Sequence, residues 1–167
     1  MWYQNRLSLL FVQFLLALSA CGQISFDERM EQLYKGTVPV IQSKALAQLD
    51  PEQYVLLDVR SEEEYRVSHI SKARLIIYND FELEQIKDLP KETKIVVYCA
   101  IGVRSESVGE QLLRSGFQDV SNLYGGIFGW KNEGFSVVDQ DSKPTERVHT
   151  YNKSWSKWLY EGEKVYE

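Results

Sequence analysis

The stretch from Lys94 to Ser105 reads KIVVYCAIGVRS and predicts a buried strand that runs directly into a short loop. Its first part, Ile95–Tyr98, is β-branched and aromatic, which is typical of a strand in the interior of a sheet. Cys99 follows the strand at once, and the residues after Ser105, ESVGEQLLR, have helical spacing of apolar side chains. The sequence therefore places Cys99 between the carboxyl end of a strand and the amino end of a helix, where α/β folds position reactive groups.

Cys99 has the surroundings of a nucleophilic thiol. A helix amino terminus carries about half a positive charge, and its free N–H groups stabilise a thiolate or a bound anion. Arg104 adds a full positive charge nearby, and electropositive surroundings of this kind favour the reactive thiolate. Asp58 and Arg60 end an earlier strand near the same edge, so they are candidates for a supporting role.

Length and composition limit the classes of function. The chain has 167 residues, enough for one domain with a hydrophobic core, and its formal net charge of −5 disfavours nucleic acid as a partner. No Cys/His cluster has the spacing of metal ligands, and no glycine-rich dinucleotide fingerprint is present. We therefore expect neither a metal nor any other cofactor.

Residues 1–20 are typical of a signal peptide. Arg6 is the only charge before the apolar run Leu7–Ala20, which is too short for a comfortable membrane span. The run ends in LSACG, which resembles the lipobox of bacterial lipoproteins. The resemblance implies cleavage before Cys21, a lipid anchor on its sulfur, and export to a bacterial membrane, either facing the periplasm or in the outer membrane. An ordinary cleaved signal and an uncleaved anchor are the alternatives.

The chain contains two cysteines. If Cys21 carries lipid, Cys99 has no partner for an intramolecular disulfide and remains a free thiol. Disulfides are the norm in exported proteins, so a lone thiol there calls for an explanation, and a reactive role for Cys99 supplies one.

Helical and extended segments alternate from Phe26 to Trp130. We expect helices at 26–35, 44–49, 62–66, 81–86, from 105 onward and at 125–130, and strands at 38–41, 54–57, 73–78, 95–98 and 120–123. This alternation indicates an α/β fold with a parallel sheet and helices on both faces.

The last part of the chain, residues 139–167, has a different composition. Asp139–Glu146 is polar and contains a proline, so we expect a linker or loop. His149–Tyr166 is too rich in aromatic residues for a disordered stalk. Trp155, Trp158 and Leu159 are expected to pack back on the domain, with a lid or a partner-docking face as the alternative.

Several motifs occur in the order found in single-domain rhodaneses. They are Asp58-Val59-Arg60, Glu64-Tyr65, Ser68-His69-Ile70, Cys99–Ser105 and Gly125–Trp130. The chain resembles this family over about Val38–Val138, and the resemblance implies a rhodanese-like fold with a five-stranded parallel sheet. The expected boundaries are then 1–20 for the signal, 21–36 for the anchor and first helix, 37–138 for the rhodanese domain and 139–167 for an aromatic extension. The family's Gly-His-Ile-Pro-Gly-Ala turn is replaced here by SHISKA at Ser68–Ala73.

In rhodaneses, the active-site cysteine takes a sulfane sulfur from a donor such as thiosulfate and passes it to cyanide or a thiol. The resemblance therefore implies a sulfurtransferase with a persulfide on Cys99. The loop that would bind the donor through its N–H groups is Ala100, Ile101, Gly102, Val103, Arg104 and Ser105. Apart from one arginine its side chains carry no charge, which makes a persulfide or polysulfide donor as credible as thiosulfate.

Three residues of these motifs have expected structural roles. Arg104 either binds the anionic donor or braces the loop, and the sequence leaves both open. Asp58 is expected to cap the following turn, and Arg60 to pair with Glu64.

Two other classes of function compete with sulfur transfer. Cysteine phosphatases of related fold have five residues between Cys and Arg, whereas this chain has four, Ala100–Val103. The shorter loop suits a sulfur atom better than a phosphate. A non-catalytic rhodanese-like binding or sensor module is the other alternative, since fold alone does not set function. Such modules generally lose the cysteine that this chain retains at Cys99. The sequence identifies no protein partner.

Overall fold

The structure is a computed structural model that describes residues 24–166. The expected signal peptide and its lipidation site, Cys21, lie outside the described residues. Within the described range, no helix has the length and apolar character needed to span a membrane.

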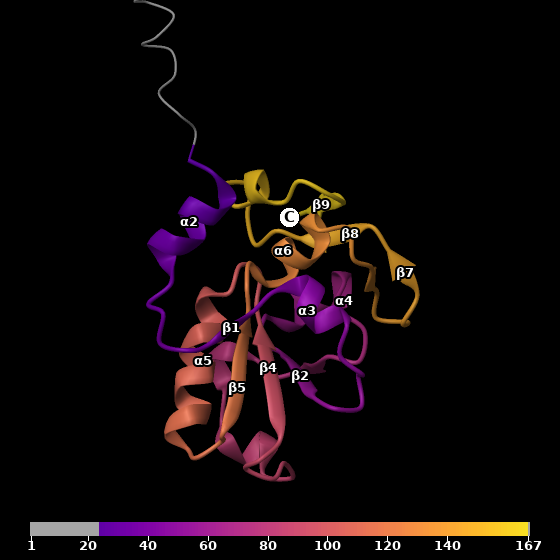
Figure 1. Cartoon of the computed structure of the whole chain (residues 1–167). Coiled ribbons are helices and arrows are strands. Elements are labelled where there is room, and N and C mark those ends of the chain that lie inside the picture. Colours follow the sequence, from indigo (N-terminus) through magenta and orange to yellow (C-terminus); the bar gives the residue numbers. More distant parts are fainter. Residues whose placement is uncertain (1–23, 167) are drawn as a thin grey trace, which may run out of the picture.

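Five parallel strands form the central sheet (Figure 1), as the sequence predicts. In chain order they are β1 (Val40–Ile41), β2 (Val55–Asp58), β3 (Arg74–Leu75), β4 (Lys94–Tyr98) and β5 (Asp119–Leu123), and their order in the sheet is β1-β5-β4-β2-β3. Strand β4 occupies the centre, and its four residues from Ile95 to Tyr98 are buried, as expected of a strand covered on both faces. The two outermost strands are shorter than expected: β1 begins only after Pro39, which has no N–H to donate, and β3 ends where the chain turns into a 3₁₀ helix at Tyr78–Asp80 (η1).

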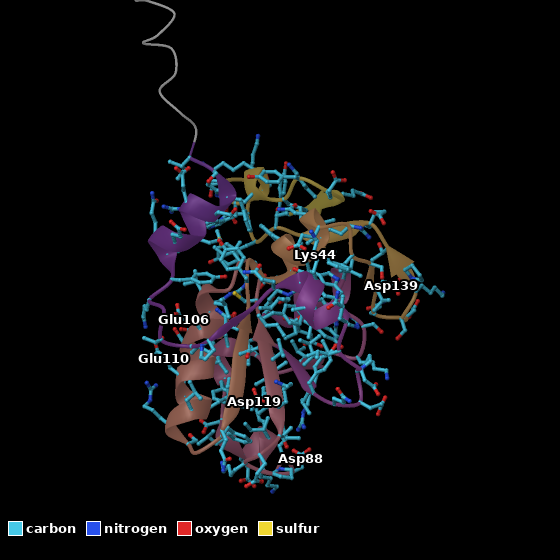
Figure 2. All side chains as sticks on the ribbon, viewed as in Figure 1. Lys44, Asp88, Glu106, Glu110, Asp119 and Asp139 are labelled. Atoms are coloured by element: carbon cyan, nitrogen blue, oxygen red, sulfur yellow. The ribbon has the colours of Figure 1, made fainter. Side chains whose placement is uncertain are left out.

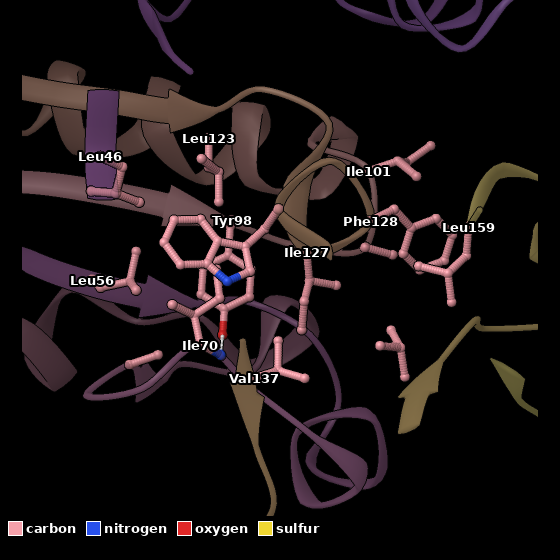
Figure 3. Close-up of a cluster of buried hydrophobic side chains, with 14 of the residues drawn as sticks. Leu46, Leu56, Ile70, Tyr98, Ile101, Leu123, Ile127, Phe128, Val137 and Leu159 are labelled. Carbon is pink, nitrogen blue, oxygen red and sulfur yellow. Dashed lines mark hydrogen bonds between the residues drawn. The ribbon is translucent and has the colours of Figure 1, made fainter. Parts of the chain in front are cut away.

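Side chains of β4 point alternately into two hydrophobic clusters, one on each face of the sheet. Val96 and Tyr98 lie in the cluster shown in Figure 3, where the Tyr98 hydroxyl accepts a hydrogen bond from the Ile70 N–H at 3.1 Å. Ile95 and Val97 lie in the other cluster.

The helices are divided between these two faces. The face of Val96 and Tyr98 is covered by α2 (Phe26–Leu33), α3 (Ser43–Ala47), α4 (Glu62–Val67) and α6 (Gly126–Asn132). The opposite face is covered by α5 (Val103–Arg114) and a short 3₁₀ helix, η2 (Leu83–Ile86), which stands where a weak helix at 81–86 was expected. The predicted α/β layering is thus confirmed.

The chain after α6 is more ordered than expected. The predicted linker contains a strand, β7 (Pro144–Thr145), paired antiparallel with β6 (Val137–Val138), so the expectation of an irregular loop over 139–146 is wrong in part. Further on, β8 (Arg147–His149) pairs in parallel with β9 (Glu163–Val165), and a 3₁₀ helix, η3 (Ser156–Trp158), lies between them.

The aromatic side chains of this C-terminal segment pack against the domain, as expected. Trp158 and Leu159 are buried in the cluster of Figure 3, and Trp155 is half-buried against it. The ring of Trp158 lies 6.4 Å from that of Phe26, so the segment also contacts α2. Figure 1 shows α2 and the yellow C-terminal segment at the same end of the molecule.

The segment between α2 and β1 is fastened to α5. The Glu106 carboxylate accepts hydrogen bonds from the N–H groups of Lys35 at 2.9 Å and Thr37 at 3.0 Å. Figure 2 labels Glu106 on α5, facing this segment. Because Glu106 is almost fully buried, these backbone donors hold the start of the chain against the domain.

The turn at Ser68–Ala73 forms without the proline and the two glycines of the family's motif. The Ala73 N–H donates to the Ile70 carbonyl at 3.1 Å, which closes a four-residue turn, and Lys72 adopts a φ of +64°. A turn with positive φ at its third residue favours glycine, and a side chain there costs about 1–2 kcal/mol. Packing of the flanking residues Ile70 and Ala73 in the core therefore holds this turn against its local preference.

A buried ion pair joins the end of β2 to the turn before α4. The Arg60 guanidinium donates to both carboxylate oxygens of Asp58, with the shortest contact 2.7 Å, and to the Ser68 carbonyl at 2.6 Å. Asp58 also accepts the Arg60 N–H at 3.0 Å, so it caps this turn as expected. Both side chains are fully buried. Burial disfavours the charge of Arg60, but the adjacent Asp58 carboxylate outweighs it and raises the pKa of the guanidinium.

Asp58→Ala should lower the free energy of unfolding by about 3–5 kcal/mol, because it leaves a buried guanidinium without its counter-charge. Urea unfolding at neutral pH measures the effect. Glu52→Ala is the matched control, since it breaks the exposed Glu52–Lys72 pair, and it should cost about 0.5 kcal/mol or less. Equal losses in the two variants would contradict the structural role of the buried pair.

Candidate active site

Cys99 lies immediately after β4, at the carboxyl edge of the sheet. Its thiol is free and the residue is 1% exposed. The Gly102 N–H donates to the Cys99 sulfur with an N–S distance of 3.1 Å. A backbone donor aimed at the sulfur is the arrangement that the sequence predicts for a thiolate or a bound anion.

Helix α5 begins at Val103, two residues earlier than expected. Gly102 is its N-cap and has a φ of +97°, a left-handed conformation that turns the chain into the helix within one residue. Val103, Arg104 and Ser105 therefore form the first helical turn, and their N–H groups have no intrahelical acceptors. The amide donors expected near the sulfur thus belong to a helix amino terminus as well as to the loop.

Helix α6 orients the carbonyl groups of the same loop. The Ile127 N–H donates to the Cys99 carbonyl at 2.9 Å, and the Phe128 N–H donates to the Ala100 carbonyl at 3.0 Å. This close approach requires glycine at Gly126, where a Cβ atom would lie 2.3 Å from the Cys99 carbonyl oxygen. The GGIFGW motif therefore acts on the loop through its backbone.

Tyr34, which follows α2, holds the loop from the opposite side. Its hydroxyl donates to the Ile101 carbonyl at 2.7 Å and accepts from the Gly125 N–H at 2.9 Å. A Cβ atom on Gly102 would lie 1.8 Å from this hydroxyl, so the loop position needs glycine for space as well as for conformation. Burial raises the pKa of the phenol, which stays neutral as a donor. No local pattern in the sequence indicates this role, because an aromatic residue on the apolar face of a helix belongs to no motif.

Two polar side chains hold the loop from beneath. The Ser105 hydroxyl donates to the Asn122 side-chain oxygen at 2.8 Å, and the Asn122 amide donates to the Gly102 carbonyl at 2.9 Å. Both side chains are fully buried. Ser105 therefore supports the loop indirectly, by orienting Asn122 of β5, which bonds the Gly102 carbonyl. Asn122 was not among the predicted site residues.

Arg104 braces the loop by pairing with Glu64. Its two terminal nitrogens each lie 2.8 Å from one Glu64 oxygen, in a bidentate pair. The prediction that Arg60 pairs with Glu64 is wrong. Arg60 donates to Asp58, and the Glu64 carboxylate accepts hydrogen bonds from Arg104 and from the Ser61 N–H. Burial opposes ionisation of Glu64, but hydrogen bonds and charge from Arg104 outweigh it and lower the pKa of the carboxyl.

An open cavity of about 400 Å³ lies over Cys99. Loop residues Ala100, Ile101, Val103 and Arg104 line it, together with Arg60. Among the described residues, the Arg60 Nη1 atom is buried without an acceptor, while its other nitrogens bond Asp58 and Ser68. Asp58 lies behind Arg60 and does not line the cavity, so of the two predicted supporting residues only the arginine reaches it.

The lowered pKa of Glu64 predicts an acid-dependent loss of stability. The ordinary pKa of a glutamate is 4.5, and at any pH above this value the ionised Glu64 contributes its full stabilisation to the fold. This contribution is lost as the pH falls through the lower pKa that Glu64 has in the folded state. Glu64→Gln should therefore be less stable than wild type at neutral pH, and the difference should shrink as the pH falls below 4.5. Urea unfolding across this range measures it. A difference that stays constant with pH would contradict the charged pair, and the exposed neighbour Glu62→Gln is the control.

Comparison with known proteins agrees with this geometry. The family model described as Rhodanese-like domain matches residues 42–133, more than half of the chain. The tRNA uridine(34) hydroxylase of Streptococcus pyogenes serotype M12 is 44% identical over 81 residues, which are 46% of this chain and 25% of that protein. The protein of the same name from Cytophaga hutchinsonii is 39% identical over 48% of this chain and 27% of its own length. The chain thus spans about a quarter of the curated relatives it matches.

Solved structures share the fold. A rhodanese-related protein from Thermoplasma volcanium has a TM-score of 0.53 and 33% identity, covering 60% of this chain and 97% of its own. A thiosulfate sulfurtransferase from Pseudomonas aeruginosa has a TM-score of 0.55 over 73% of this chain and 23% of its own, and at 22% identity it bears on the fold alone. With its five-stranded parallel sheet and the family's cysteine loop, the chain belongs to the rhodanese-like domain family.

Proposed function

We propose that this protein is a sulfurtransferase that carries sulfane sulfur as a persulfide on Cys99. The observation that supports it most is the Gly102 N–H directed at the Cys99 sulfur from the amino end of α5. Such donors stabilise the thiolate before transfer and the terminal sulfur of the persulfide after it.

Each half of the reaction is a displacement at sulfur. The Cys99 thiolate attacks the outer sulfur of the donor, a new S–S bond forms, and the donor's own S–S bond breaks with its electron pair leaving on sulfite or a thiolate. An acceptor thiolate or cyanide then attacks the terminal sulfur of Cys99–S–S⁻ and releases the Cys99 thiolate. No metal or redox cofactor enters either step.

Phosphate transfer is supported less well. With four residues between Cys99 and Arg104, and with Arg104 engaged by Glu64, the loop offers no unpaired cation to a phosphate dianion. A binding or sensor module shares the fold, but it has no need of a nucleophile held by a backbone donor. The hydroxylase name of the curated relatives belongs to proteins about four times as long as the shared region, so we do not extend that activity to this chain.

Cys99→Ser should abolish the catalysed formation of thiocyanate from cyanide, with either thiosulfate or a hydropersulfide as donor, because the alcohol does not form a persulfide. The direct reaction of cyanide with the hydropersulfide remains as a background that is measured without protein. Intact mass after incubation with the donor should show one added sulfur atom on the wild type, removed by dithiothreitol, and none on the variant. Cys21→Ser is the control and should behave as wild type. Phosphatase turnover without any sulfur uptake would reject the proposal, and inertness towards every donor would favour a binding module.

We further propose that the mature protein is anchored to a bacterial membrane through lipid on Cys21, with the domain outside the inner membrane. The support is the LSACG sequence at the end of an uncharged, mostly apolar run that follows Arg6. More than one acyl chain gives a stable anchor, since each buried CH₂ contributes about 0.8 kcal/mol.

Cells that express the protein and are fed labelled palmitate should incorporate label into the wild type, whereas Cys21→Ala should stay unlabelled and leave the membrane fraction. Cys99→Ala serves as the control and should label normally. Label that persists in Cys21→Ala would rule out this attachment site.

A further inference from the structure

The cavity over Cys99 extends well beyond the loop that surrounds the sulfur. Its outer walls are lined by large apolar and aromatic side chains, namely Leu33, Ile77, Tyr78, Val103, Tyr151 and Trp155. Its volume of about 400 Å³ lies in the range of small-molecule sites and exceeds what a sulfur atom or thiosulfate needs. An organic group therefore fits next to the reactive sulfur.

The charges around the cavity are balanced. Arg60 and Arg104 are the charged residues in its lining, and each already has a carboxylate partner, Asp58 and Glu64 respectively. A dianionic donor that entered the cavity would lose hydration and gain no unpaired counter-charge, because the buried Arg60 Nη1 atom, which has no acceptor among the described residues, belongs to a guanidinium already paired with Asp58. A neutral donor has no such cost.

Half of the residues in the outer wall lie outside the region matched by the family model. Leu33 belongs to α2, and Tyr151 and Trp155 belong to the C-terminal segment, whereas the match covers residues 42–133. The two segments also contact each other, because the Arg29 guanidinium lies 5.8 Å from the centre of the Trp155 ring. Leu33, Tyr151 and Trp155 therefore add to the cavity a part that the family model does not cover.

Tyr151 is held over the site at some cost. Its φ is +64°, a left-handed conformation that is unfavourable for a side chain by about 1–3 kcal/mol. The residue is 59% exposed, and its ring lies 5.7 Å from the Arg104 guanidinium. The Tyr151 N–H donates to His149 Nδ1 at 3.1 Å, which holds the backbone of this turn and leaves the exposed ring at the cavity.

We propose that the donor is a small organic hydropersulfide, R–S–SH, whose uncharged apolar or aromatic R group lies between the loop and the side chains of Tyr151 and Trp155. This inference rests on the proposed sulfurtransferase function. The Cys99 thiolate attacks the outer sulfur of R–S–SH, the donor's S–S bond breaks, and R–S⁻ leaves with the electron pair, so that Cys99 carries –S–SH. An apolar cavity favours the neutral hydropersulfide, which is the form that a thiolate can attack.

Single-turnover uptake of sulfur by the full chain, followed by intact mass, compares three probes. They are benzyl hydropersulfide, glutathione hydropersulfide and thiosulfate, which offer the same sulfane sulfur on an apolar, a charged and an inorganic carrier. The second-order rate constant for benzyl hydropersulfide should exceed each of the other two by about tenfold or more. Equal rate constants, or faster uptake from thiosulfate, would overturn the inference while leaving the proposed function standing.

Substitutions in the outer wall test the same point. Tyr151→Ala and Trp155→Ala should each lower the ratio of the benzyl to the thiosulfate rate constant by about tenfold, since each removes apolar surface that contacts R. Val103→Lys should also lower this ratio, because it adds an unpaired cation that attracts thiosulfate. Tyr160→Ala is the matched control: Tyr160 is 57% exposed in the same segment, lies outside the cavity lining, and should leave the ratio unchanged.

The outcomes separate the two proposals. If no donor adds sulfur to Cys99, the proposed function and the inference both fail. If sulfur is added but the ratio is the same in wild type, Tyr151→Ala and Val103→Lys, only the inference fails. Tyr151 is mostly exposed, so its variant keeps the test valid even if Trp155→Ala does not fold.

Discussion

Two backbone hydrogen bonds, from the first turn of α6 to the carbonyls of Cys99 and Ala100, control the reactive loop. They fix the peptide groups that carry the Ala100 and Ile101 N–H groups, while the next peptide group, whose Gly102 N–H donates to the sulfur, is held at its Ile101 carbonyl by the Tyr34 hydroxyl. They need a residue without a side chain at Gly126, where the helix meets the loop. The geometry of the sulfur site thus depends on how closely two pieces of backbone approach.

The same loop gains positive character without a free cation. Arg104 and Arg60 both lie at the site, yet Glu64 and Asp58 balance them, and the bidentate contacts make each arginine a rigid part of the scaffold. The N–H dipoles at the start of α5 add to the positive field at the sulfur. Because each arginine at the site is already paired with a carboxylate, the site fits a neutral sulfur donor better than an anionic one.

Much of the fold follows from local patterns that the sequence displays. The run Ile95–Tyr98 predicted the central strand, and the alternation of strands and helices predicted a parallel sheet, because period and turn signals are local properties. Boundaries were less accurate where one residue's conformation decides them. Gly102 adopts a positive φ and starts α5 two residues early, and the polar stretch around Pro144 forms a strand because β6 offers it a partner.

Neighbouring residues were enough to predict that a cysteine follows the central strand, that a helix amino end faces it, and that Gly102 lies between them. The pairing of Glu64 with Arg104 instead of Arg60, and the approach of Tyr34 and Trp155 to the site, became visible only in the folded chain. Such contacts join residues far apart in the chain, 67 positions in the case of Tyr34 and Ile101. They depend on how whole elements pack, which no local pattern of residues records.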